Sequence, residues 1–153
     1  MRKLLVGVVC AAAMAVPSVS PAQQQEGWSY AYIEGVATAT HRDSRGRTTA
    51  TLTCRPPTGD IILTDYTLGT ARSSRGATQA SVRIGVMAVN VPMTIEGRGR
   101  NRTVVINLPQ RPPILAAVQP NDRLSVTVNN QTVTYPDNGP ARMREVAYAC
   151  WGS

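Results

Sequence analysis

Histidine, cysteine and phenylalanine are scarce or missing in this sequence of 153 residues, and their scarcity excludes several kinds of site. His41 is the only histidine, the three cysteines form no CxxC motif, and phenylalanine is absent. Zinc sites and redox-active dithiols need such ligands at short spacing. No G-x-S-x-G motif marks a nucleophile, and no pair of acidic residues indicates the carboxylates of a glycosidase. We therefore predict no metal, no cofactor and no enzymatic activity.

Long apolar runs are missing after the first 22 residues. Two basic residues, the apolar run Leu4–Val16 and the small residues Ser20–Ala22 follow one another, which is the pattern of a secretory signal peptide. The run is shorter than the about 20 residues of a membrane helix, although a retained N-terminal anchor is the alternative. We expect a signal peptide over residues 1–22 and a single domain over residues 23–153. The mature protein would then be periplasmic or secreted from a bacterium, with no transmembrane segment.

Cleavage would remove Cys10 and leave Cys54 and Cys150. An even number of cysteines in an oxidising compartment predicts a disulfide between them. Closing so long a loop would stabilise the fold by about 4–5 kcal/mol in the chain-entropy treatment, which is an upper figure.

Positive charge in the mature chain comes from arginine alone. The net charge of +7 includes Arg2 and Lys3, the latter being the only lysine, so the mature chain carries about +5. The excess has two interpretations: the composition of a GC-rich genome with ordinary solubility, or affinity for an anion. The planar fork of arginine suits phosphate and carboxylate, but composition names no ligand.

Alternating apolar and polar residues predict a mainly β fold. In Thr48–Cys54, for example, Ala50, Leu52 and Cys54 share one face and threonines share the other. Val82, Ile84 and Val86 also share a face, and a change of phase near Asn90–Pro92 predicts a bulge or an edge position. The expected strands are Trp28–Thr40 with a bulge at Gly35, Thr48–Cys54, Ile61–Leu68, Ser81–Val89, Val91–Ile95, Val104–Leu108, Arg123–Val128 and Gln131–Tyr135.

The C-terminal segment has helical periodicity instead. Met143, Val146, Ala147 and Cys150 fall at positions i, i+3, i+4 and i+7, which form one face of an α-helix. Half-buried antiparallel strands pack best as two sheets or as a flattened barrel. We expect an antiparallel two-sheet β-sandwich of seven or eight strands, with one short C-terminal helix and one disulfide.

Three arginine-bearing loops are the candidate binding site. We call them the first, second and third arginine loops: His41–Arg47, Ala71–Gly76 and Gly97–Arg102. If they lie at the same end of the fold, their arginines would form one anion-binding rim. Alternatively, they are solvated turns whose charges prevent aggregation at sheet edges. The loops contain no aromatic residue that could stack on bases, which disfavours nucleic acid. The candidate anion-binding residues are Arg42, Arg45, Arg47, Arg72, Arg75, Arg98, Arg100 and Arg102.

Two smaller features have competing interpretations. His41 and Asp43 could act as an acid–base pair, but their position in a predicted turn favours a surface histidine. The aromatic residues Trp28, Tyr30 and Tyr32 alternate along one strand. They are either core residues, which we favour, or the exposed face of an edge strand that pairs with a partner.

The layout of the chain resembles a known group of proteins. Trp28 stands near the mature N-terminus, a strand ends in Cys54, the apolar step Ile114–Val118 precedes Leu124–Val128, and a terminal helix ends in Cys150. This order resembles small periplasmic β-sandwich proteins of the invasion-associated locus B type, and is similar to type VI secretion accessory proteins of the TagO/VasI group. The resemblance implies a non-enzymatic role in host association, secretion or envelope assembly, and supplies no catalytic residue.

We therefore expect an exported binding or accessory protein whose partner is a protein or an anionic envelope component, such as lipopolysaccharide or a cell-wall polymer. Two alternatives remain open. The protein could be a periplasmic chaperone or inhibitor that binds a secreted protein by edge-strand addition. It could also be an enzyme that acts on the cell wall or on polysaccharide.

Overall fold

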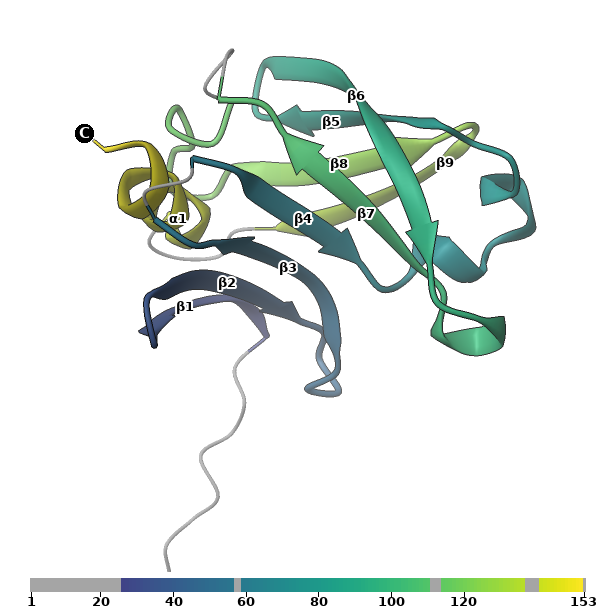
Figure 1. The fold of residues 1–153 in the computed structure, drawn as a ribbon, viewed down its shortest axis with the longest axis horizontal. Helices are drawn as coiled ribbons and strands as arrows, with labels where there is room; N and C mark the ends of the chain where they lie inside the picture. The colour runs from purple at the N-terminus through teal and green to yellow at the C-terminus, as the bar shows by residue number, and fades with distance from the viewer. Residues whose placement is uncertain (1–25, 57–58, 111–113, 137–140, 153) are drawn as a thin grey trace, which may run out of the picture.

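The computed structural model describes residues 26–56, 59–110, 114–136 and 141–152, and this part of the chain forms nine β-strands and one α-helix (Figure 1). The expected signal peptide lies outside the described residues. The strands are β1 (Gly27–Ile33), β2 (Val36–Arg42), β3 (Thr48–Cys54), β4 (Ile61–Asp65), β5 (Gln79–Ile84), β6 (Met87–Glu96), β7 (Thr103–Leu108), β8 (Arg123–Val128) and β9 (Gln131–Pro136). The helix is α1 (Arg142–Trp151), and the short 3₁₀ turns are η1 (Leu68–Thr70), η2 (Arg72–Ser74) and η3 (Gly99–Asn101).

All nine strands belong to one antiparallel sheet with the order β1-β2-β3-β4-β7-β6-β5-β8-β9. The sheet curls into a nearly closed barrel (Figure 1). The mainly β fold with a C-terminal helix is confirmed. Nine strands form where seven or eight were expected, and they make one continuous, nearly closed sheet that is not clearly a two-sheet sandwich. The physical reason is the long strand β6, which pairs with β5 through Gln79↔Pro92 and its neighbours and with β7 from Met93 onward. One strand therefore continues the hydrogen-bonded ladder around the barrel.

Two tight turns were not recognised in the sequence. Glu34 and Gly35 take φ values of 51° and 76° and join β1 to β2, so Gly35 makes a hairpin turn where a bulge was expected. Gly85, with φ 54°, opens the turn between β5 and β6 and leaves Val86 97% exposed. The predicted strand Ser81–Val89 is therefore wrong. The change of phase between Ile84 and Val91 comes from this turn, because the pairing of β5 with β6 runs without interruption.

Helix α1 packs on the inner side of β1 to β4, at the opposite end of the barrel from the turn between β2 and β3 (Figure 1). Its buried residues are Met143, Val146, Ala147 and Cys150, as the periodicity predicts. Cys54 and Cys150 form the expected pair, with their Cα atoms 6.1 Å apart. Trp151 is half-buried, and its Nε1 donates a hydrogen bond to the carbonyl of Gly59. Within the described residues, no helix has the length and apolarity needed to cross a bilayer.

Candidate functional site

The strand register brings the three arginine loops to one end of the barrel. Arg42 of β2 pairs with Thr48 of β3, and Glu96 of β6 pairs with Thr103 of β7, so the first and third loops connect paired strand ends. Strand β4 ends between them, because Asp65 pairs with Ala50 on one side and Val104 on the other. The segment after Asp65 forms η1 and leads into the second loop, and η1 contacts η3 of the third loop (Figure 1). We call this end of the barrel the arginine end.

Charge at the arginine end is strongly positive. Against its eight arginines stand four acidic residues: Glu26, Asp43, Asp65 and Glu96. Arg47 is the only one of the eight that forms a salt bridge within the described part of the chain. The exposed arginines are Arg45, Arg47, Arg72, Arg75, Arg98 and Arg100, while Arg42 and Arg102 are half-buried.

Asp43 organises the first arginine loop. Its Oδ1 accepts hydrogen bonds from the backbone N–H groups of Arg45 and Arg47, both at 2.9 Å. Its Oδ2 accepts from the Arg47 side chain, at 2.8 Å from Nε and 2.7 Å from Nη2. These bonds, the side-chain bond from Arg47 first, lower the pKa of Asp43. The carboxylate therefore shapes the turn and neutralises Arg47, while Arg45 keeps an unpaired charge.

Asp65 organises the start of η1, the turn that leads into the second loop, from a fully buried position. Its Oδ1 accepts hydrogen bonds from the backbone N–H groups of Thr67 and Leu68, at 2.7 and 2.8 Å, and from the Thr67 hydroxyl at 2.9 Å. Its Oδ2 accepts a hydrogen bond from the Tyr135 hydroxyl. Burial, followed by the nearby charge of Asp65, raises the pKa of Tyr135, so this hydroxyl stays protonated as a donor.

The η1 turn, which precedes the second loop, packs directly against the third loop. Gly69 is buried in η1, and a Cβ atom at this position would collide with the backbone carbonyl of Arg102. Ser74, also fully buried, donates a hydrogen bond of 2.7 Å to the carbonyl of Leu68 and holds the segment closed. Glycine at position 69 therefore allows η1 to lie directly beside the third loop.

His41 is buried, and the expectation of a surface histidine is wrong. Only 5% of the residue is exposed, because Ala37, Ala39 and His41 continue the inward face of β2. Its Nδ1 lies 2.7 Å from the hydroxyl oxygen of Thr49. Burial lowers the pKa of His41, although the charge of Asp43 opposes this effect. Because Nε2 has no hydrogen-bond partner among the described residues, an added proton there would find no acceptor.

The ring of His41 lies between two other aromatic rings. The ring centroid of Trp28 is 5.3 Å away and that of Tyr135 is 5.1 Å away, both in edge-to-face geometry. We call Trp28, His41 and Tyr135 the seam cluster, because it joins β1 and β2 to β9, the last strand of the sheet. The expected core role is confirmed for Trp28 and Tyr30, which pack against the core, but Tyr32 is 56% exposed.

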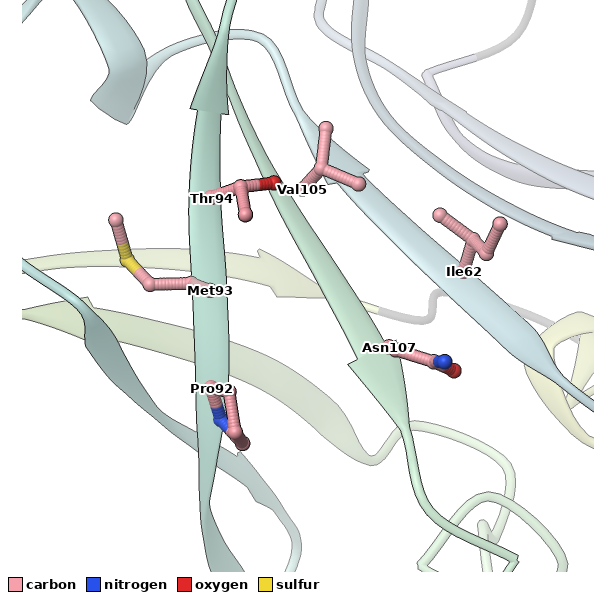
Figure 2. Close-up of a pocket in the computed structure, with 6 residues that line it drawn as sticks. All are labelled: Ile62, Pro92, Met93, Thr94, Val105 and Asn107. Carbon is pink, nitrogen blue, oxygen red and sulfur yellow. The ribbon is translucent and has the colours of Figure 1, made fainter.

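A separate groove lies on the outer face of the sheet. Figure 2 shows it between β6 and β7, beside β4, where β6 turns away from β7 toward β5. Its volume is about 230 Å³. The lining contains no titratable side chain, so the groove offers apolar contact, one side-chain amide and one hydroxyl but no acid or base. Its lining residues are Ile62, Pro92, Met93, Thr94, Val105 and Asn107.

Comparison with protein-family models, curated proteins and solved structures finds no match to this chain. The resemblance to the invasion-associated locus B and TagO/VasI types therefore stays a prediction. In the described residues, no group of three histidine, cysteine, aspartate or glutamate side chains could hold a metal ion. The arginine end is the feature of this structure with the most developed binding chemistry.

Proposed function

We propose that this is a non-enzymatic, exported bacterial protein whose arginine end binds an anionic component of the envelope. The observation that carries the proposal is the convergence of three arginine loops on one end of the barrel. Arginine binds phosphate and carboxylate groups through two parallel N–H donors. The layout resemblance supports a role in host association, secretion or envelope assembly.

The environment of the loops favours binding to an external anion. Asp65 is buried and engaged with η1, and Asp43 is engaged with its own loop, so neither carboxylate neutralises the exposed arginines of the other loops. Glu26 and Glu96 are the remaining acids at this end. A field of one sign steers an oppositely charged partner toward the surface and raises the association rate.

The test is binding to lipopolysaccharide across a salt series. We expect binding at low salt that weakens as salt rises, because exposed charges are screened. The variant Arg45→Glu/Arg100→Glu should bind more weakly. The matched control is Arg123→Glu, which changes an exposed arginine at the start of β8, away from the three loops. Absence of binding by the unmodified protein at low salt would overturn the proposal for this ligand.

A second candidate function is edge-strand addition to a secreted protein. Strands β1 and β9 end the sheet order, so each has one edge without a partner strand in the described structure. The end of β1 also exposes Tyr32 and Ile33, at 56% and 66%. This function predicts a stoichiometric protein complex that is insensitive to salt, and a pull-down from periplasm at high salt distinguishes it from anion binding.

A further inference from the structure

We propose that the arginine end recognises an extended linear polymer of repeating phosphate groups, which bridges the first and third arginine loops, and not a single small anion. This inference rests on the proposed function and specifies the class of ligand. The inference has two grounds. The fold holds the loops at a fixed separation, and each loop alone would bind an anion only weakly.

The distance between the two loops exceeds the reach of one anion. The first loop joins β2 to β3 and the third joins β7 to β6, so three strand spacings separate their centres in the order β2-β3-β4-β7-β6. At about 4.8 Å per spacing, this is roughly 14 Å along the sheet. A hydrogen bond to a phosphate oxygen spans only about 3 Å. A phosphate group hydrogen-bonded close to one loop therefore does not reach the other loop, whereas a chain of phosphate groups can contact both.

Each loop alone is a poor binding site. In the first loop Arg47 is engaged with Asp43, Arg42 is half-buried, and Arg45 is the exposed arginine without a salt bridge. The third loop exposes Arg98 and Arg100. A single exposed ion pair contributes about 0–1 kcal/mol, because both charges remain solvated. Useful affinity therefore requires simultaneous contacts to more than one loop.

The loops are held at this separation before any ligand binds. Asp43 fixes the shape of the first loop through two backbone hydrogen bonds. Asp65 fixes the start of η1, and the contact of Gly69 with Arg102 joins η1 to the third loop. Loops ordered by the fold lose little conformational entropy on binding. A fixed separation also implies a minimum ligand length, below which bridging fails.

The chemistry favours phosphates along a backbone over stacked bases. Tyr66 is 43% exposed near this end, and its hydroxyl lies 3.4 Å from the hydroxyl oxygen of Thr51 on the neighbouring strand. One tyrosine cannot supply the series of aromatic platforms on which single-stranded nucleic acids stack. Without aromatic neighbours, arginine side chains recognise only the negative charge of a ligand and the arrangement of its oxygen atoms. The matching ligand repeats its phosphate groups and needs no bases.

Inorganic phosphate polymers of different length provide the probe. Titrations at low salt would compare triphosphate, which is shorter than the separation of the loops, with long-chain polyphosphate. We expect long chains to bind about 100-fold more tightly per phosphate group, which is the lower range of gains from linked sites. Equal affinity per phosphate for short and long chains would overturn bridging.

Variants then identify the two points of attachment. Arg45→Glu removes the exposed arginine of the first loop that has no salt bridge, and Arg100→Glu sets a negative charge against Arg98 in the third loop, so each should reduce long-chain affinity nearly to that of triphosphate. The double variant should lose little more, because bridging is already lost. Arg123→Glu should bind long chains like the unmodified protein, and urea unfolding would confirm that all variants are folded. Additive losses in the double variant would overturn bridging. If lipopolysaccharide still binds in that case, the proposed function stands without this inference.

Discussion

Tyr135 is the residue that connects the most distant parts of this fold. From β9 its hydroxyl donates a hydrogen bond to the buried carboxylate of Asp65 on β4 and lies 3.4 Å from the carbonyl oxygen of Thr49 on β3. Because Asp65 also holds η1, this hydroxyl supports the second arginine loop indirectly.

Tyr135→Phe should therefore destabilise the protein. The ring would remain, but one oxygen of a buried carboxylate would lose its donor, at a cost of about 1–3 kcal/mol in the free energy of unfolding. Urea unfolding measures this cost. Tyr148→Phe is the matched control, because Tyr148 is 48% exposed and its contact with Arg144 uses the ring. Equal stability of Tyr135→Phe and the unmodified protein would contradict the role assigned to the hydroxyl.

His41 should make stability depend on pH. Burial lowers its pKa in the folded state, so below the ordinary value of 6.5 the unfolded chain binds a proton that the folded protein does not. The free energy of unfolding should therefore be greatest above pH 6.5 and fall as the pH falls further. His41→Gln cannot titrate, so its unfolding free energy should fall less over the same pH range. Parallel curves for the two proteins would show that His41 does not contribute.

For single residues, the alternation of apolar and polar side chains along the strands indicated more buried positions than we predicted from it. Ala50, Leu52 and Cys54 are buried as expected. The same period places Asp65 with Ile61 and Leu63, and His41 with Ala37 and Ala39, on inward faces. His41 was assigned to the surface because charged and turn-forming residues follow it, and the burial of Asp65 was not predicted. Alternation predicts which face of the sheet a side chain occupies. It does not predict the hydrogen-bond partner of a buried polar side chain, because that partner can lie on a strand distant in sequence.

Individual elements were predictable where the period was long and uninterrupted. Strand β3 and the buried face of α1 have the expected boundaries and residues. The turns at Glu34–Gly35 and Gly85–Val86 were missed, because each two-residue turn lies between strands that continue the apolar pattern. The change of phase was the available signal for the second turn, and it was attributed to a bulge or an edge position.

Helix α1 should depend on its covalent connection to β3. The Cys54–Cys150 pair joins residues 96 positions apart, so the disulfide restricts a long loop of the unfolded chain. Reduction should lower the free energy of unfolding by about 2–5 kcal/mol. Denaturation with and without reductant measures the loss, and the Cys54→Ala/Cys150→Ala variant should match the reduced protein. Alkylation followed by mass measurement checks the premise, since two free thiols in the protein purified without reductant would contradict it.

The order of the whole sheet could not be obtained from the sequence. Alternation identifies strands, but the pairing of β4 with β7 and of β5 with β8 joins segments separated by other strands. The same local patterns are compatible with two stacked sheets or with one curled sheet. The length of β6 decides between these two arrangements, because β6 pairs with β5 before Met93 and with β7 from Met93 onward. This change of partner depends on contacts between strands that are distant in sequence.

The seam of the barrel should be its least protected part. Strands β1 and β9 end the sheet order, and the seam cluster connects them through side chains. We expect backbone amides of β1 and β9 to exchange with deuterium fastest among the strands, and those of the central strands β4 and β7 slowest.

Trp28→Ala removes the ring that lies 6.2 Å from that of Tyr135, measured between centroids. This change should accelerate amide exchange in the β1–β2 hairpin and in β9 while leaving β4 and β7 close to their original rates. Ser29→Ala is the control, because Ser29 is exposed on the other face of β1 and makes one hydrogen bond of 3.3 Å to Thr40. Equal acceleration in all strands would mean that the seam opens only by global unfolding. Equal protection of β1, β9 and β4 in the unmodified protein would mean that backbone hydrogen bonds close the barrel.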